Sequence, residues 1–366
     1  MKIGIRLVLW LLVVGALGIT LNSAYRTYQA SQARNDVADV TTRSMGLVKQ
    51  PPKHLAAQFT DVGNRMLADP VSADKSRDPA TIVLAHVVAS DTDKIGLDWE
   101  KFEAHIAAVT GRKVIDRSFD NNPEDLDAIK DGKISVVVVH APEAPFLVNN
   151  YGFQPFAVVG DESGAIGNHL DIIVAPNSEI SHPGDLKKHA LVCTTPSSIT
   201  GYRAAVTLLL HNEGLRPNVD YDVTWSVSQK KSIKGVIAHK FNSAAVSDEK
   251  LQSMLADGDI KESQYKVIYS SEVIPRATIG CFYDLKPELA AKIQQAIISF
   301  KSEKMTSADA GEDSQGDAAD AVKHVRFIPV DYKRDFKLVR EIDDSFDPRV
   351  GAKPPKSHAA SPATQK

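Results

Sequence analysis

Cysteine is scarce in this chain of 366 residues, which contains only Cys193 and Cys281. Because the two lie far apart and match no metal-ligand spacing, the sequence indicates neither a zinc site nor a disulfide framework. We interpret both as buried free thiols. In an exported protein they would be able to pair, but only if the fold brought them close together.

An excess of charge of either sign is also lacking. The 43 lysines and arginines are nearly balanced by 46 acidic residues, and the formal net charge is -3. A protein that binds duplex nucleic acid needs a basic surface, so we expect no nucleic-acid partner. Hydrophobic residues make up 43% and charged residues 24%, a globular composition that argues against wholesale disorder and against a multi-span membrane protein.

The familiar motifs of catalysis are absent as well. The chain has no Gly-x-Ser-x-Gly elbow, Walker A loop, His-Glu-x-x-His helix or dinucleotide glycine fingerprint. We therefore expect no cofactor, no metal and no enzymatic activity. An enzyme would need a base within reach of a hydroxyl such as that of Ser198 or Thr200.

One long hydrophobic run is present, at the amino terminus. Lys2 and Arg6 precede an uncharged apolar run from Leu7 to Leu21, which is typical of an export segment. By the positive-inside rule, the rest of the chain lies outside the cytoplasm. Residues 1–25 are therefore a membrane anchor or a cleaved signal. The anchor is favoured because Asn22 stands where a cleavage site needs a small apolar residue.

Strands alternate with helices along most of the chain, which predicts α/β lobes with largely parallel sheets. The first series consists of the strands Thr81–Val88, Lys113–Ile115, Ile134–Val139 and Leu170–Ala175 and the helices Trp99–Val109 and Pro123–Ile129. The second consists of the strands Ala190–Cys193, Tyr221–Trp225 and Ser243–Val246 and the helices Gly201–Glu213 and Ser232–His239. Two strands, Tyr265–Tyr269 and Ala277–Phe282, and a helix, Pro287–Phe300, follow.

The flanks of these series are polar. Residues 26–78 are interpreted as a spacer that is partly helical. Alternatively, they form an extra helical layer on the first lobe, because apolar residues recur there at helical spacing: Leu55, Phe59, Val62 and Met66. Residues 344–366 are rich in Pro, Lys, Ala and Ser, which predicts a disordered tail.

The segment with the most chemical information runs from Val192 to Tyr202, where a strand ends and a helix begins among consecutive hydroxyl residues. Free backbone N–H groups at a helix start carry a partial positive charge, and hydroxyl groups add further donors. This pattern predicts an anion site whose residues are Ser197, Ser198, Thr200, Gly201 and Tyr202. The alternative is an ordinary helix cap, with Tyr202 as a core residue.

This strand, its Ser-x-Thr-Gly-Tyr turn and the helix that ends in Asn212-Glu213-Gly214-Leu215 resemble the periplasmic phosphonate, phosphite and phosphate-binding proteins of ABC transporters. The resemblance extends from about Ile82 to Ile342. It includes four further motifs in the same order, namely Asp131-Gly132-Lys133, Pro183-Gly184-Asp185-Leu186-Lys187, Pro287-Glu288-Leu289 and Phe327-Ile328-Pro329-Val330.

The resemblance implies a type II periplasmic-binding-protein fold, in which two α/β lobes are joined by two crossing strands and clamp a ligand between them. Lobe I would comprise residues 79–175 and 273–343, and lobe II residues 176–272. The implied ligand is a small oxyanion, and the implied partner is an ABC permease that recognises the closed form. The chain would lie in the periplasm, anchored to the inner membrane by residues 7–25 or released after signal cleavage.

Several positions depart from the family pattern. Ser198 and Thr200 keep their hydroxyls in the turn, but Ile199 has lost one. Gln229 stands in place of a histidine, and Ser247, followed by Asp248, in place of an acidic residue. His140 begins the turn that often supplies an aromatic side chain. These changes predict a retuned pocket, and a membrane-tethered sensor or interaction module with the same fold is the alternative function.

Overall fold

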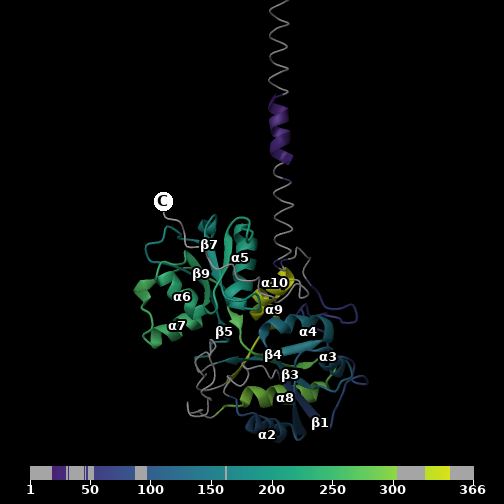
Figure 1. The fold of residues 1–366 in the computed structure, drawn as a ribbon. Helices are drawn as coiled ribbons and strands as arrows, with labels where there is room; N and C mark the ends of the chain where they lie inside the picture. The colour runs from purple at the N-terminus through teal and green to yellow at the C-terminus, as the bar shows by residue number, and fades with distance from the viewer. Residues whose placement is uncertain are drawn as a thin grey trace, which may run out of the picture.

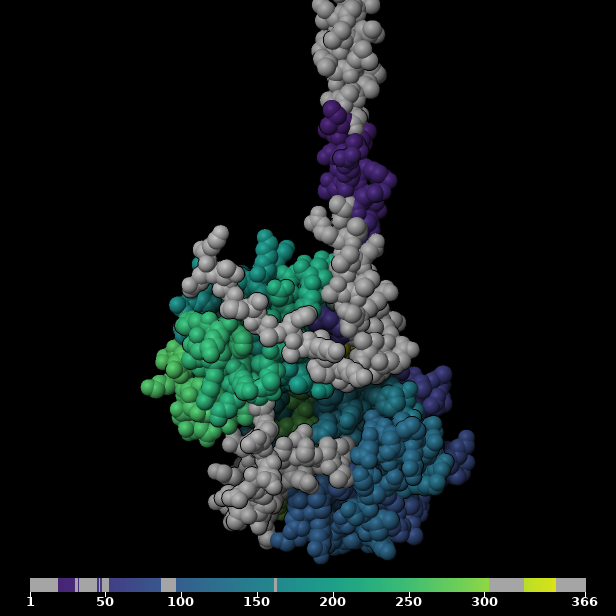
Figure 2. All heavy atoms as spheres, in the orientation of Figure 1, coloured from purple at the N-terminus to yellow at the C-terminus, as the bar shows by residue number. Residues whose placement is uncertain are grey.

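The computed structural model describes residues 19–29, 53–86, 97–160, 163–302 and 326–346, together with Gln32, Met45 and Leu47. These residues form two α/β bodies, each built around its own sheet (Figure 1). In the space-filling view they are two masses, one mainly blue and one mainly green (Figure 2).

The sheet of lobe I has six strands in the order β13-β4-β12-β3-β1-β2. The strands are β1 (Thr81–His86), β2 (Lys113–Ser118), β3 (Val136–Val139), β4 (Phe153–Gly160), β12 (Thr278–Phe282) and β13 (Arg326–Pro329). Helices α2 (Trp99–Thr110) and α8 (Pro287–Ser299) pack on one face, and α3 (Pro123–Lys130) and α4 (Ala144–Tyr151) share a core with the other. All four valines of β3 are buried, as expected for a strand covered on both faces.

The sheet of lobe II has five strands in the order β10-β6-β9-β7-β8. The strands are β6 (Leu170–Val174), β7 (Ala190–Cys193), β8 (Asp222–Trp225), β9 (Ser243–Ser247) and β10 (Lys266–Ser270). Helix α5 (Ala204–Glu213) joins the core on one face, while α6 (Gln229–Ile237) packs with the core on the other. Helix α7 (Asp248–Ala256) directly follows β9 and adds Leu251 and Met254 to that second core.

A short antiparallel pair, β5 (Gly167–Asn168) with β11 (Ile274–Pro275), carries the chain between the sheets. The change of sheet therefore comes at β5, before the predicted boundary at residue 175. Strand β6, assigned by that boundary to lobe I, pairs with β9 and β10 in lobe II. The apolar sequence of β6 predicts a buried strand, but its partners lie about 70 or more residues away along the chain and leave no local signal.

Among the elements that were not predicted are α4, β4, α7, and the two helices α9 (Tyr332–Asp335) and α10 (Lys337–Ser345). Helix α10 follows the last strand of lobe I but contacts α5 of lobe II as well as α4. Its buried residues, Leu338, Val339 and Ile342, recur at helical spacing among charged residues, which is the pattern of an amphipathic helix.

The alternative interpretation of residues 26–78 as a helical layer is wrong for residues 53–78, which form turns and extended chain. Leu55 and Met66 do pack against the core, but Val62, which would share their helical face, is 91% exposed. Residues 19–29 are helical and exposed, and are drawn away from both lobes in Figure 1. Within the described ranges, no helix has both the length and the hydropathy needed to cross a membrane. Residues 344–346, where the disordered tail was predicted to begin, instead end α10 and include the buried Phe346. Most of the apolar run Leu7–Leu21 and residues 347–366 of the predicted tail lie outside the described residues.

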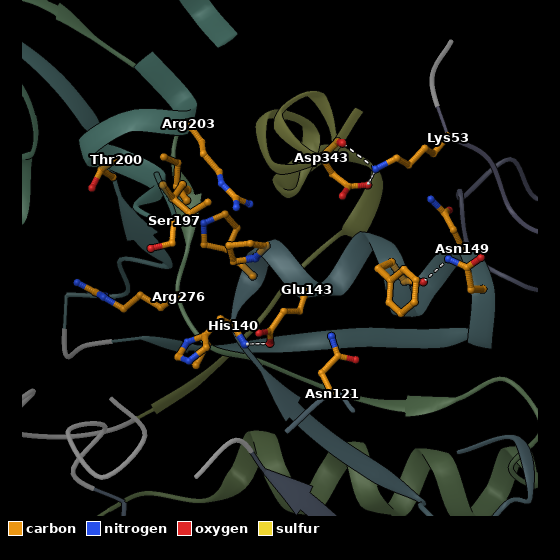
Figure 3. Close-up of a pocket in the computed structure, with 18 of the residues that line it drawn as sticks. Lys53, Asn121, His140, Glu143, Asn149, Ser197, Thr200, Arg203, Arg276 and Asp343 are labelled. Carbon is orange, nitrogen blue, oxygen red and sulfur yellow. Dashed lines mark hydrogen bonds and ion pairs between the residues drawn. The ribbon is translucent and has the colours of Figure 1, made fainter. Parts of the chain in front are cut away.

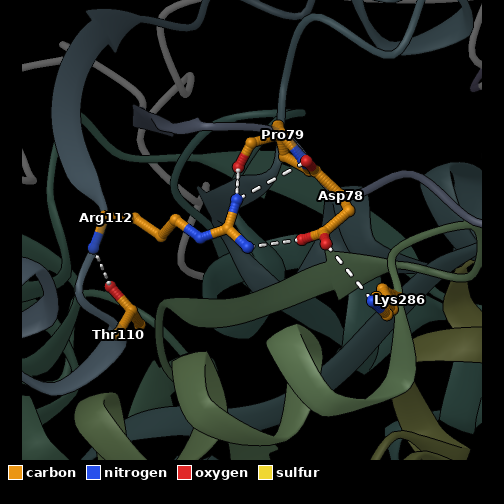
Figure 4. Close-up of polar contacts among 5 residues, drawn as sticks. All are labelled: Asp78, Pro79, Thr110, Arg112 and Lys286. Carbon is orange, nitrogen blue, oxygen red and sulfur yellow. Dashed lines mark hydrogen bonds and ion pairs between the residues drawn. The ribbon is translucent and has the colours of Figure 1, made fainter.

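Ion pairs fix the segment before β1 to lobe I. Asp78 accepts hydrogen bonds from Arg112 at 2.6 Å and from Lys286 at 3.3 Å (Figure 4). Arg77 donates to both carboxylate oxygens of Asp284, at 2.6 and 2.8 Å, and to the carbonyl oxygen of Gly132 at 2.6 Å. These contacts replace the predicted helix packing as the reason for the segment's position.

Replacing Asp284 by asparagine is expected to lower the free energy of unfolding by about 1–2 kcal/mol, because Arg77 keeps one acceptor but loses the paired charge. Urea denaturation measures this. The control is Asp131→Asn, which removes an exposed pair with Lys133 and should leave the midpoint unchanged. Equal midpoints for the two variants would contradict the proposed clamp.

Candidate functional site

A cleft of about 1140 Å³ lies between the two lobes. Its wall includes polar residues of lobe I, the start of the α5 helical segment, the crossing strands, and both terminal segments (Figure 3). The polar lining residues are Lys53, His54, Asn121, His140, Glu143, Asn149, Asn150, Asn168, Ser197, Thr200, Arg203, Arg276 and Asp343. The cleft therefore draws on chain regions about 290 residues apart.

The predicted anion turn begins as a π-helical turn, Ile199–Arg203, which continues directly into α5. Such turns are rare and are frequent at functional sites. Ser198 caps the turn, because its Oγ accepts a hydrogen bond from the Gly201 N–H at 3.0 Å. The Gly201 carbonyl accepts from the Thr194 N–H at 3.0 Å. Ser198 and Gly201 thus shape the turn, and neither lines the cleft.

Ser197 and Thr200 do line the cleft. The Ser197 hydroxyl lies 3.2 Å from that of Thr195, and the Thr200 hydroxyl accepts a hydrogen bond from Gln229 Nε2 at 3.2 Å. In the part of the chain that the structure describes, the backbone N–H groups of Ile199 and Thr200 have no acceptor. These donors stand at the positive end of the helix dipole, which favours an anion.

Gln229, Ser247 and Asp248 lie behind the wall of the cleft. Gln229 Oε1 accepts from the Ser247 N–H at 2.6 Å, so the amide side chain links β9 to Thr200. Asp248 Oδ1 accepts from the His169 N–H at 2.7 Å. None of the three predicted ligand contacts is a lining residue; Gln229 orients Thr200 instead, and Asp248 joins β9 to the chain before β6.

Tyr202 belongs to the core. It is 2% exposed, and its ring packs against Trp225 at 5.0 Å and Phe346 at 6.0 Å between centroids. Burial raises the pKa of its phenol, whose hydroxyl donates to the Met45 carbonyl oxygen at 3.4 Å. The alternative interpretation of Tyr202 as a core residue therefore describes its side chain.

Three cations of the cleft were missed. Arg203 donates through Nε to the Pro196 carbonyl oxygen at 3.0 Å; burial lowers its pKa, but a guanidinium stays protonated in proteins. Arg276, next to the crossing strand β11, contacts Glu249 at 3.2 Å, and Lys53 pairs with Asp343 at 2.9 Å. Arg203 follows the hydroxyl turn closely enough to have been noticed, whereas the other two carry no local signal.

Acidic and imidazole groups complete the wall. His140, a predicted site residue, lines the cleft, and its N–H donates to Glu143 Oε2 at 3.1 Å. Burial raises the pKa of Glu143 and that of Asp343. Among the described residues, no acidic or histidine side chain hydrogen-bonds to the hydroxyl of Ser197, Ser198 or Thr200, and no cluster suited to a metal occurs. Cys193 and Cys281 are both buried and free.

Two sheet-centred lobes, a crossing-strand pair and a ligand-sized cleft between them define a type II periplasmic binding protein. More specifically, the chain belongs to the family described as the phosphonate periplasmic substrate-binding proteins of ABC transporters, whose model matches residues 87–336. This confirms the resemblance and the fold class inferred from the sequence. No curated protein matches the chain.

Solved structures of one protein share the fold. XAC2383 from Xanthomonas citri, in structures bound to chloride ion and to ATP, has a TM-score of 0.51 in both, with 16% and 15% identity, over 74% of this chain and 99% and 98% of the other. PhnD1 from Prochlorococcus marinus in complex with methylphosphonate has a TM-score of 0.44 and 13% identity, over 72% of this chain and 97% of the other. At 16% and 15% identity, the similarity to XAC2383 concerns the fold alone.

Proposed function

We propose that this protein is an extracytoplasmic solute-binding protein that captures a small oxyanion of the phosphonate, phosphite or phosphate class for an ABC permease. The observation that carries the proposal is that hydrogen-bond donors lie together at the cleft wall, namely the hydroxyls of Ser197 and Thr200 and the backbone N–H groups of Ile199 and Thr200. Arg203 and Arg276 line the same cleft and supply positive charge. Binding proteins of this kind hold their ligand without chemical change, so no catalytic role is assigned.

The departures from the family pattern bear on which oxyanion is held. Ile199 supplies no hydroxyl, so the site has one donor fewer at the turn than the family's usual three. Each buried group left without a partner costs about 1–3 kcal/mol, so an oxyanion that needs that donor binds about tenfold or more weakly. Arg203 and Arg276 offset part of this loss because charged donors form stronger hydrogen bonds.

The direct test is isothermal titration calorimetry of the full chain in detergent with phosphate, phosphite and methylphosphonate, each at saturating concentration. We expect heat of binding with at least one of the three. Sulfate, which has a similar shape but no proton at neutral pH, serves as the selectivity control. The absence of heat with all three phosphorus oxyanions would remove the proposed ligand class.

Replacing Thr200 by valine is expected to lower the affinity for the bound oxyanion about tenfold, because one hydroxyl donor is lost without a change of shape. Calorimetry measures the shift. The matched control is Thr207→Val, which removes a buried hydroxyl on the same helical segment that does not line the cleft. An equal loss of affinity in both variants, or none in Thr200→Val, would contradict the assigned role.

A sensor or interaction module remains the second candidate, and one observation favours it. Met45 and Leu47 lie between the lobes and the predicted membrane segment. Met45 contacts Tyr202 of the turn Ile199–Arg203, and Leu47 forms a β-bridge with Phe346, which packs on Tyr202. A sensor would pass ligand occupancy through these contacts to a membrane partner. Genes for a permease and an ATPase beside this one would favour transport, and a histidine kinase gene would favour sensing.

Cell fractionation tests the proposed anchor, since a released protein would appear in the soluble fraction.

A further inference from the structure

Helix α10 joins the two lobes beside the turn Ile199–Arg203. Helix α10 follows the sheet of lobe I, yet Phe346 directly after it packs on Tyr202 at 6.0 Å and under the Arg203 guanidinium at 5.4 Å. The Ser345 hydroxyl lies 3.3 Å from His211 Nε2 of α5. In Figure 1, α10 and α9, in yellow, lie at the junction of the lobes. Lobe I thus contacts lobe II through a second connection besides β5 and β11.

The amino-terminal segment reaches the same place. Leu47 forms a β-bridge with Phe346, and the Met45 carbonyl accepts from the Tyr202 hydroxyl. Lys53 ties this segment to α10, with Nζ at 2.9 Å from Asp343 Oδ2 and its N–H at 2.8 Å from Asp344 Oδ1. Farther along, the Ala56 N–H donates to the Asn149 carbonyl of α4 at 2.8 Å. Lys53 and Ala56 therefore contact lobe I and α10, while Met45 contacts Tyr202 in the turn Ile199–Arg203 of lobe II.

We propose that Met45, Leu47, Lys53 and residues 337–346, here called the strap, hold the two lobes in one arrangement while the cleft is empty and position Arg203 at the rim of the cleft. Rotation about β5 and β11 would expose Phe346, Leu47 and Tyr202, which are 7%, 3% and 2% exposed. Exposing this apolar surface to water is unfavourable, so the arrangement in which it stays buried is the stable one. One buried cluster already combines side chains of lobe I, lobe II and α10.

The strap lies outside residues 87–336, the part that matches the family model. The hinge motion expected for a two-lobed binder is therefore opposed in this chain by segments that the family match does not include. The positioning of Arg203 rests on the proposed function, because Arg203 matters only if the cleft binds an anion. The locking of the lobes does not depend on a ligand.

The test is an inter-lobe distance measurement by electron paramagnetic resonance on the full chain, with spin labels at Lys130→Cys in lobe I and Lys234→Cys in lobe II. Both side chains are exposed, and the native cysteines are buried and should not react. We expect one narrow distance in the absence of ligand. A broad distribution without ligand would overturn the proposal.

Phe346→Ala should replace the narrow distance by a broad distribution and weaken oxyanion binding about tenfold, since Arg203 loses the ring beneath it. Phe300→Ala is the matched control, because Phe300 is also 7% exposed but belongs to the core of lobe I alone. Its distance should stay narrow. Leu47→Ala is the second strap variant should Phe346→Ala not fold. A narrow distance in both strap variants would refute the lock, whereas an intact lock without binding of any oxyanion would refute only the proposed function.

Discussion

Replacement of Gly201 by alanine is expected to lower the free energy of unfolding by about 2–3 kcal/mol and to weaken oxyanion binding by more than about 100-fold. A Cβ at this position would lie well inside van der Waals contact of Thr194 Oγ1 and Ser198 Oγ. Thr194 is buried and β-branched, so its side chain has little freedom to move away. The turn must therefore shift as a whole.

The consequence for binding follows from the hydrogen bonds of Gly201. Its N–H donates to Ser198 Oγ and its carbonyl accepts from Thr194, so both ends of the anion turn depend on this residue. A shift would turn the Ile199 and Thr200 N–H groups away from the cleft. Calorimetry and urea denaturation measure the two effects. The control is Gly63→Ala, whose added Cβ would have the movable side chain of Arg65 as its nearest neighbour; unchanged affinity in Gly201→Ala would refute the placement of the anion.

The sequence predicts the α/β elements well because their signals are local. β3 is a run of four valines, and α2 shows its apolar face at Phe102 and Ile106, so each can be recognised without knowledge of the rest of the chain. Strand pairing is different. β6 and β10 pair in lobe II although they lie about 100 residues apart along the chain. The sequence of neither strand indicates which strand it pairs with. The boundary between the lobes was misplaced for that reason.

For the same physical reason, only part of the cleft wall could be predicted from the sequence. The hydroxyl turn after β7 is contiguous, so Ser197 and Thr200 were found together. Gln229 was also identified, but its amide supports Thr200 from behind because the hydrogen bonds to Thr200 and Ser247 use both of its ends. Lys53 and Asp343 reach the cleft only because the two terminal segments meet over α5, a tertiary feature without a motif.

Replacement of Gly167 by alanine is expected to be the other severe change, with a loss of about 3 kcal/mol in unfolding free energy. Gly167 belongs to β5 and pairs with Pro275 of β11 at the crossing between the lobes. A Cβ there would collide with the backbone carbonyl of Ile274, and a backbone atom cannot rotate aside as a side chain can. The two crossing strands would have to separate.

Separation of the strands would also move Arg276, whose N–H donates to the Ile166 carbonyl oxygen at 3.0 Å and whose side chain lines the cleft. We therefore expect Gly167→Ala to lower both the urea midpoint and the oxyanion affinity. Gly184→Ala is the control, since the atoms nearest to its added Cβ belong to the side chains of Glu213 and His182. If Gly167→Ala matched this control in both measurements, the close approach of β5 and β11 would not be what sets the position of Arg276.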